Sequence, residues 1–363
     1  MGGTLRKKEK PSIISEWAYF PILTIIFLTA CKTASIMDTL QIKGFAMATT
    51  YSIVVPGVHS DSETAEKLRT EIPAAIAQIE NSISIFEPES EISRFNATST
   101  TDWFPVSEET AGLVETSLEI SRETGGAFDI TVGSAVELWG FGPDKPTQSM
   151  KSEQSSSTVS VPISYQKLEL RFSPPALRKS LPDMQLDLSG IAKGYAVDRV
   201  AMIIGSYNLH NYKVDIGGDL RTAGLNADET YWKIGIAAPV QSTLEPVLQL
   251  TDTAVATSGD YRNFRQWNNQ RLSHFIDPKT GKPTEQKGLS VTVVDDQCVR
   301  ADALATAMAV LGSDKGYVLA AEKNWKVYFI YFQDGTWFEQ ATAAINPLFI
   351  TSTPSGNYPA PRE

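Results

Sequence analysis

The chain has 363 residues, of which 42% are hydrophobic and 20% charged, a globular composition that excludes a disordered or collagen-like protein. Its 32 basic and 42 acidic residues give a net charge of -10, and a general nucleic-acid binder is excluded because phosphate neutralisation needs a basic surface. The two cysteines and three histidines have no zinc-ligand spacing, so a zinc ribbon and a disulfide scaffold are excluded as well.

The N-terminus has the order of parts found in a bacterial lipoprotein signal peptide. A basic stretch (6–10) precedes an apolar run (17–28), which is too short to span a membrane because a spanning helix needs about 20 apolar residues. The four residues that end at Cys31 (LTAC) then resemble a lipobox. We expect residues 1–30 to be a signal peptide and Cys31 to be lipidated; the alternative is an ordinary signal peptide followed by an incidental cysteine.

Lipidation of Cys31 would place the mature chain in the cell envelope, anchored to a membrane and facing the periplasm. Residues 31–43 are expected to be the tether. No later stretch approaches the length of a spanning helix, so we expect the body of the protein to be soluble outside the cytoplasm. Lys32 follows the cysteine, where inner-membrane retention usually needs Asp, and this leaves both the outer and the inner membrane open as the destination.

The body of the chain predicts strands and helices without a regular βα repeat. Ser107 is a suitable N-cap for one helix, Gly125 and Gly126 end it, and Pro73 indicates a kink or a restart in an earlier helix. In chain order, the predicted elements are a strand at 45–55, helices at 61–83 and 107–124, strands at 167–172 and 184–188, a helix at 190–204, strands at 212–216, 232–237, 247–250 and 289–294, helices at 301–311 and 314–322, and a hairpin of strands 325–332 and 336–340.

This order of elements predicts an α+β fold with largely antiparallel sheets covered by helices, because strands dominate the second half of the chain and helices come in ones and twos. We expect one domain over 44–350, followed by a C-terminal tail (351–363). The polar, low-complexity stretch at 143–162 is expected to be a surface loop.

Two glycine-containing segments could bind a ligand, and each also has a purely structural interpretation. DLSGIAKGYAVD (187–198) opens a helix whose N-terminus suits phosphate, with Lys193 adding charge. An aspartate cap with closely packed glycines explains its spacing better, since the pattern matches no nucleotide-binding motif. DIGGD (215–219) is either a backbone approach to a flat ligand or a hairpin turn.

Polar residues near the C-terminal helices could carry catalysis. His274 lies among small polar residues before a turn (SHFIDPKTG, 273–281) and could act as a general acid or base; the alternative is a surface histidine at a strand end. Asp302 and Thr306 share one helix face and offer the oxygen ligands that Mg²⁺ prefers, or else form an acidic first turn that complements the helix dipole. For the aromatic and glycine-rich segments at 86–96, 126–133 and 139–142, capped helix ends and buried aromatics are the default interpretation.

Taken together and in this order, eight segments resemble the FAD:protein FMN transferase (ApbE) family. The resemblance runs from about Phe45 to about Leu311, and each segment alone is a weak signal. The lipobox fits as well, since many members of the family are lipoproteins. The segments are Met47 in the first strand, SEISRFN (90–96), GAFDITVG (126–133) with LWGFGP (138–143), DLSGIAKGYAVD (187–198), DIGGD (215–219), TSGDYRNF (257–264), SHFIDPKTG (273–281) and ADALATAMAVLG (301–312).

The resemblance implies an α+β fold with a flavin cleft between sheet and helices. Asp302 and Thr306 would bind Mg²⁺, with the backbone oxygen of Gly190 as a further ligand, and His274 would be the catalytic residue. Phe86 stands where many members have Tyr or Asn, and a serine-rich stretch replaces the segment after LWGFGP. The residues implied to contact FAD are Met47, Phe86, Ala127, Phe128, Asp129, Asp187, Lys193, His274 and Phe275.

The implied activity is Mg²⁺-dependent transfer of the FMN moiety of FAD to a Thr or Ser hydroxyl of a target protein, with release of AMP. Acceptors in the family carry a D-x-x-[ST]-[GSA]-A-[ST] segment and are usually subunits of membrane redox pumps. Two alternatives stay open. One is an FAD pyrophosphatase, in which water is the nucleophile and the products are FMN and AMP. The other is a non-enzymatic, lipid-anchored flavin carrier, which would need the cleft but neither the magnesium ligands nor His274.

Overall fold

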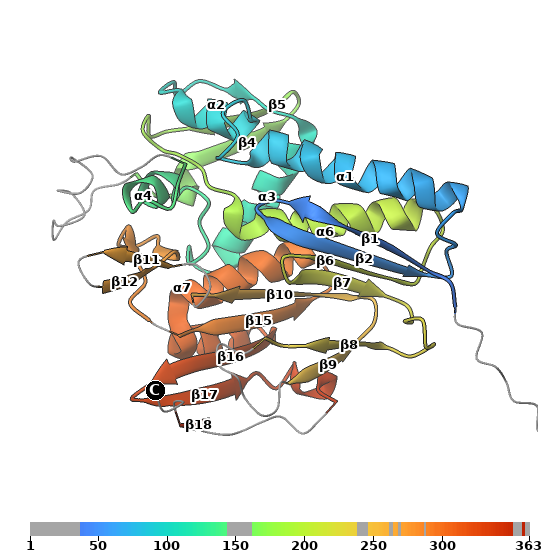
Figure 1. The fold of residues 1–363 in the computed structure, drawn as a ribbon. Coiled ribbons are helices and arrows are strands. Elements are labelled where there is room, and N and C mark those ends of the chain that lie inside the picture. Colours follow the sequence, from blue (N-terminus) through green and yellow to red (C-terminus); the bar gives the residue numbers. More distant parts are fainter. Residues whose placement is uncertain are drawn as a thin grey trace, which may run out of the picture. The chain divides into compact units, whose positions relative to one another are not determined.

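Within the described residues, a nine-stranded antiparallel sheet organises the chain (Figure 1). The structure is a computed structural model that describes residues 37–143, 162–237, 246–260, 264–267, 270–286, 288–350 and 358–359. In sheet order, the strands are β1 (Thr39–Ala46), β2 (Thr49–Pro56), β6 (Tyr212–Ile216), β7 (Asp219–Ala223), β10 (Thr253–Gly259), β15 (Ser290–Asp295), β16 (Lys326–Gln333), β17 (Thr336–Ala341) and β18 (Tyr358–Pro359).

Helices cover one face of this sheet (Figure 1). The helix α6 packs against β6 and β7, α7 packs against β10, β15 and β16, and α1 contacts β1 and α6. The apolar positions of α1 recur every three or four residues and are buried in the main core, where each large side chain contributes about 1.5–3 kcal/mol. The helices are α1 (Glu63–Ile83), α2 (Glu91–Ala97), α3 (Glu108–Glu123), α4 (Gly133–Leu138), α6 (Ser189–Ser206) and α7 (Cys298–Glu322).

The opposite face of the sheet carries a second, smaller core beneath the hairpin of β8 (Trp232–Gly235) and β9 (Val247–Leu250). Leu220 and Val255 belong to this core from the sheet side, and Trp232 and Leu248 belong to it from the hairpin. The Trp232 indole Nε1 also donates a hydrogen bond of 3.0 Å to the Ala223 carbonyl, which ties the hairpin to β7. The middle of the sheet is therefore buried on both faces.

The remaining strands form small sheets at the periphery of the helical layer. The small sheets are β3-β5-β4, made of β3 (Phe104–Pro105), β5 (Pro175–Lys179) and β4 (Leu168–Phe172), and the hairpins β11-β12 (Phe264–Trp267 and Gln270–Ser273) and β13-β14 (Ile276–Asp277 and Lys282–Pro283).

None of the helices in the described part of the chain has the length and apolarity needed to cross a bilayer.

The predicted α+β class is confirmed, and so are several local signals. The Ser107 hydroxyl accepts the Thr110 N–H at 3.1 Å as the N-cap of α3, and Gly125 and Gly126 end that helix with φ of 61° and 78°. Gly312, with φ of 79°, separates the two predicted C-terminal helices inside the range of α7. These features depend on residues close together in the chain, which is why the sequence pattern predicts them.

The first predicted strand (45–55) is confirmed over 49–55, which lies in β2, but residues 45 and 46 end β1, and the two strands form a hairpin. β1 and β2 pair along their whole length and join at Met47 and Ala48, whose φ values are 52° and 55°. Positive φ at both central residues is the geometry of a two-residue hairpin turn, but neither residue is the Asn or Gly that usually signals it. The tether prediction (31–43) is wrong from Thr39 onward, since β1 begins there.

One further prediction is wrong for a tertiary reason, and another is wrong in part. The segment 184–188 makes only a single bridge, from Gln185 to Val132, instead of a strand. The backbone of Leu186 bonds instead to the Asn96 side chain, with distances of 2.7 and 2.8 Å. The restart expected at Pro73 is absent, because α1 continues through Pro73 as one helix; the alternative of a kink stays a prediction.

Several predictions fall outside the described residues and stay predictions. These are the signal peptide (1–30), the lipidated Cys31, nearly all of the loop expected at 143–162, and most of the C-terminal tail.

The β1–β2 turn leads to a stability prediction. Ala48→Gly should raise the free energy of unfolding by about 0.5–1 kcal/mol, because the left-handed backbone at this position is strained for alanine and relaxed for glycine. Urea denaturation followed by circular dichroism measures the change. The matched control is Ala46→Gly in β1, which should lower the stability by a similar amount, and stabilisation by both variants would contradict the assigned turn.

Candidate active site

One cavity of about 470 Å³ brings together residues from distant parts of the chain. Its walls come from α6, α7, the turn between β6 and β7, the strand β8, the end of β10 and the segment before β13. Met47 and Phe86 are predicted FAD contacts that do not line it. The predicted site residues that do line it are Ala127, Phe128, Asp129, Asp187, Gly190, Lys193, His274, Phe275, Asp302 and Thr306.

The helices α6 and α7 cross closely beside this cavity. A Cβ atom at Gly194 would lie 2.3 Å from the Cys298 carbonyl oxygen and 2.8 Å from the Asp302 Cβ, so only glycine fits at the crossing. The bare Gly194 N–H donates a 2.9 Å hydrogen bond to Asp302 Oδ2. One turn further along α7, the Thr306 hydroxyl lies 3.4 Å from the Gly190 carbonyl oxygen. The crossing therefore sets the positions of all three predicted magnesium ligands.

The oxygen atoms at this crossing fit a magnesium ion. The Asp302 carboxylate, the Thr306 hydroxyl and the Gly190 carbonyl are hard oxygen donors, and the Ser258 hydroxyl lies 3.3 Å from the Thr306 hydroxyl. The described residues contain no cluster of three His, Cys, Asp or Glu side chains that could hold a metal. A set with a single carboxylate suits Mg²⁺, which keeps several water or phosphate ligands of its own.

Lys193 lies between two buried carboxylates. Its ammonium pairs directly with Asp219 Oδ2 and lies 3.7 Å from Asp302 Oδ1. Burial opposes the charge on Lys193, but the two carboxylates outweigh it and raise the pKa of this lysine. Burial and the nearby Asp302 carboxylate raise the pKa of Asp219 to about 7, against the effect of Lys193. Lys193 therefore lines the cavity as a member of an ion-pair network with Asp219 and Asp302.

His274 lies between β12 and the β13–β14 hairpin. The imidazole tilts over the Phe275 ring, with ring centroids 4.0 Å apart and an interplanar angle of 38°. The turn of the following β13–β14 hairpin is fixed by the buried Trp139, whose Nε1 donates a 2.8 Å hydrogen bond to the Gly281 carbonyl. Arg265 donates in turn to the Trp139 carbonyl at 2.9 Å. The segment LWGFGP thus supports the histidine without lining the cavity itself.

Two aspartates organise the loops on the other side of the cavity. Asp129 accepts hydrogen bonds from the Thr131 N–H at 2.8 Å and the Tyr165 N–H at 2.9 Å, and burial outweighs these bonds and raises its pKa. Asp187 accepts the Ser189 N–H at 2.9 Å, and burial likewise raises its pKa. Asp187 lines the cavity, but the N-cap of α6 is Leu188. The expected aspartate cap therefore lies one residue too early, and Asp187 bonds to the N–H of the first helical residue.

The two residues outside the cavity have different surroundings. The Met47 N–H donates to Glu80 Oε1 at 2.5 Å, so α1 holds the tip of the β1–β2 hairpin. Phe86 is 56% exposed, which leaves its ring available to a partner but assigns it no ligand. Their predicted contacts with FAD stay predictions.

Further residues line the cavity that were not among the predicted contacts of FAD or metal. Lys213 and Asp215 of β6 line the cavity, as do Lys233 to Ala237 of the β8 segment. The alternation in β6 could have indicated this, because Val214 faces the main core and its neighbours therefore face the other side of the sheet. Gly217 and Gly218 form the β6–β7 turn, which confirms the hairpin interpretation of DIGGD. Both glycines also line the cavity, and their approach to a ligand stays a prediction.

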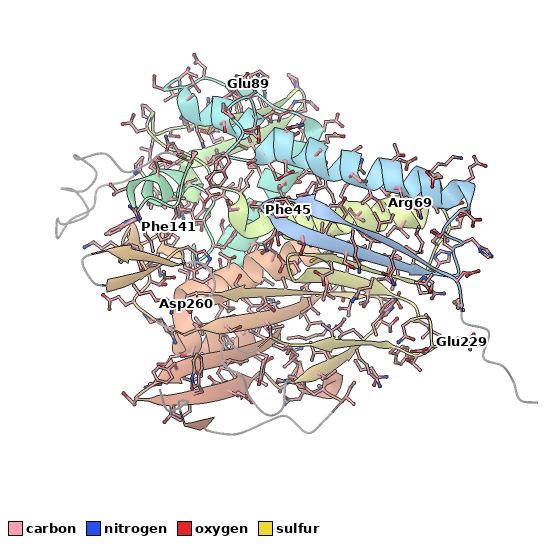
Figure 2. All side chains as sticks on the ribbon, in the orientation of Figure 1. Phe45, Arg69, Glu89, Phe141, Glu229 and Asp260 are labelled. Carbon is pink, nitrogen blue, oxygen red and sulfur yellow. The ribbon has the colours of Figure 1, made fainter. Side chains whose placement is uncertain are left out.

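Asp260, at the end of β10, is a further structural anchor (Figure 2). Its buried carboxylate accepts the N–H groups of Gly288 and Leu289, each at 3.0 Å, and its carbonyl accepts a 2.7 Å bond from Arg271. Arg271 lies in β12, just before the segment that carries His274. Asp260 therefore connects β15 to the segment that presents the histidine.

The sequence is similar to a family of known proteins over most of its length. The sequence model of the ApbE family matches residues 47–329. The chain is 35% identical to the FAD:protein FMN transferase of Vibrio cholerae over 332 residues, which is 90% of this chain and 97% of that protein. It is also 35% identical to the FAD:protein FMN transferase of Haemophilus influenzae, over 89% of this chain and 95% of that protein.

Solved structures agree with the sequence comparison. The flavin transferase ApbE from Vibrio cholerae superposes with a TM-score of 0.75 at 34% identity, covering 86% of this chain and 99% of that one. The apo form of the flavinyl transferase ApbE from Pseudomonas stutzeri gives a TM-score of 0.76 at 30% identity, covering 87% of this chain and 98% of that one.

The helix crossing leads to a prediction that uses two glycines of the same helix. Gly194→Ala should lower the free energy of unfolding by about 1–3 kcal/mol, because the added methyl group forces α6 away from α7. Gly205→Ala is the matched control. A Cβ at Gly205 meets no atom within 4 Å, so alanine there should raise stability by about 0.5–1 kcal/mol. Equal effects of both variants in urea denaturation would show that the crossing is not close.

Proposed function

This chain belongs to the ApbE family and is a transferase, and we propose that it transfers the FMN moiety of FAD to a Thr or Ser hydroxyl of a target protein and releases AMP. One observation carries the proposal. The oxygen donors at the α6–α7 crossing and the imidazole of His274 line the same cavity as the first turn of α6. That combination suits the cleavage of a pyrophosphate next to a hydroxyl nucleophile.

The pyrophosphate of FAD would lie at the start of α6. The positive end of the α6 dipole favours negative charge there, and Gly190 allows close approach because it has no side chain. Asp302, Thr306 and the Gly190 carbonyl would hold Mg²⁺. When bound, this ion would neutralise charge on the phosphate oxygens as the pyrophosphate breaks.

His274 is the proposed general base. A hydroxyl is a weak nucleophile, so the imidazole would accept its proton as the oxygen bonds to the FMN phosphorus. The bond from that phosphorus to the bridging oxygen breaks, and AMP leaves with the electron pair. The product is FMN in phosphodiester linkage to the target protein. The support from Trp139 and Gly281 keeps the histidine in place during this transfer.

The acceptor and the compartment are proposed from the sequence. The acceptor is a protein with a D-x-x-[ST]-[GSA]-A-[ST] segment, and we expect it to be a subunit of a membrane redox pump. A lipid on Cys31 would anchor the enzyme to the outer or inner membrane, facing the periplasm where such acceptors are found.

A mass-shift assay tests the proposed function. The protein is mixed with FAD, Mg²⁺ and a tagged acceptor that carries the motif, and the acceptor is weighed by mass spectrometry. We expect a gain equal to one FMN. Asp302→Ala should abolish the gain, and His274→Ala should slow it about 10²–10⁴-fold, because general base catalysis contributes about that much.

The control and the alternatives follow from the same assay. His210→Ala should transfer at the rate of the unaltered protein, since His210 is exposed and does not line the cavity. Free FMN and AMP without an acceptor gain would make the protein an FAD pyrophosphatase. Intact, bound FAD with neither product would leave the flavin carrier and exclude the transferase.

A further inference from the structure

Asp219 is a buried carboxylate that the proposed reaction does not use. Its side chain is 1% exposed, it pairs with Lys193, and it was not among the residues expected to bind FAD or metal. The Asp302 side chain is 4% exposed, and the Lys193 side chain between the two carboxylates is 30% exposed. The Lys193 ammonium therefore interacts more closely with Asp219 than with Asp302, and both carboxylates are shielded from water.

Asp219 is fixed firmly in the sheet. It begins β7 directly after the Gly217–Gly218 turn, and its Oδ1 accepts the Thr257 N–H from β10 at 3.2 Å. Its Oδ2 is left to pair with Lys193. Lys193 comes from a different element, the helix α6, and its flexible four-carbon stem lets the ammonium reach either carboxylate. The position of the ammonium is thus decided by which carboxylate attracts it more strongly.

The two oxygens of Asp302 are used differently. Oδ2 accepts the Gly194 N–H at 2.9 Å, which fixes the carboxylate plane. Oδ1 lies 3.7 Å from the Lys193 ammonium, beyond hydrogen-bond distance, and accepts no hydrogen bond within the described residues. Oδ1 is therefore the oxygen of Asp302 that a cation can take.

We propose that Asp219 is a positioning residue that holds the Lys193 ammonium away from Asp302 Oδ1 and so leaves this oxygen open to a divalent cation. The inference rests on the proposed function, because it takes Asp302 as a ligand of Mg²⁺. Asp219, Lys193 and Asp302 form a charged triad. With the Asp219 charge removed, Asp302 is the only carboxylate left in this triad. The ammonium then moves to Oδ1 and competes with the metal for it.

This competition can be distinguished from a direct charge effect on the metal by measuring how Lys193→Met changes metal binding with and without Asp219. If both residues acted only through their field at the metal, Lys193→Met would strengthen metal binding by the same factor with or without Asp219. If Asp219 acts by holding Lys193, Lys193→Met changes metal binding little while Asp219 is present and strongly once Asp219 is gone. The two cases differ in the coupling of a double-mutant cycle.

The experiment measures Mn²⁺ binding to the full chain by electron paramagnetic resonance and Mg²⁺ binding by competition, without FAD or acceptor. Asp219→Asn should weaken Mn²⁺ binding about tenfold, Lys193→Met alone should change it less than about threefold, and the double variant should return to within about threefold of the unaltered protein, since contacting charged residues couple by such factors. Equal effects of Lys193→Met in both backgrounds would overturn the proposal.

A second comparison covers the case in which Asp219→Asn alone does not fold. Lys193→Met and the double variant each remove charge from the triad without leaving an unpaired ammonium. The proposal expects their Mn²⁺ affinities to agree within about threefold, because Asp219 has no lysine left to hold. Markedly weaker binding by the double variant would mean that Asp219 acts on the metal directly, and the proposal would be wrong.

The control separates this inference from the proposed function. Asp302→Ala should abolish Mn²⁺ binding. If it does not, the metal site itself is wrong and both proposals fail. If Asp302→Ala abolishes binding while the cycle shows no coupling, the metal site stands and only the role of Asp219 is refuted. Asp198→Asn is the matched control, because it removes the same charge from the ion pair of Asp198 with Arg221. In the Asp198→Asn background, Lys193→Met should change the Mn²⁺ affinity only as much as it does in the unaltered protein.

Discussion

The close approach of α6 to α7 is the constraint on which the site depends. Both helices bury apolar residues against the same sheet, so the core fixes where they cross. The missing side chain at Gly194 lets the Asp302 carboxylate accept a backbone N–H of the other helix. Thr306 then faces the Gly190 carbonyl, and Lys193 is brought between two carboxylates. A packing contact between helices thus sets the positions of the oxygen atoms that fit a magnesium ion.

The parts of the fold that could be predicted are those decided by neighbouring residues. The Ser107 cap and the turn at Asp334 and Gly335 follow local rules that the sequence displays directly. The β1–β2 turn could not be predicted, because Met47 and Ala48 adopt left-handed backbone conformations without the residue types that usually signal them. The segment at 184–188 has strand-like composition, but a side chain 90 residues earlier takes the backbone hydrogen bonds of Leu186.

The site was predictable mainly through the resemblance, since each motif alone is a weak signal that also allows a structural explanation. Gly217 and Gly218 make a hairpin turn and line the cavity, and Asp187 lines the same cavity while it accepts the N–H of Ser189. What the sequence did not reveal are the supporting residues. Asn96, Trp139 and Asp219 act through partners far away in the chain, and no spacing rule connects them to those partners.

The bond between Gly190 and Thr306 joins residues 116 positions apart. Closing so long a loop is unfavourable until the rest of the chain is in place, so these oxygens meet only when folding is essentially complete. No part of the unfolded chain presents them together. A cation bound at the crossing therefore stabilises the whole fold by mass action instead of a single turn, and its binding reports that the helices have reached their final register on the sheet.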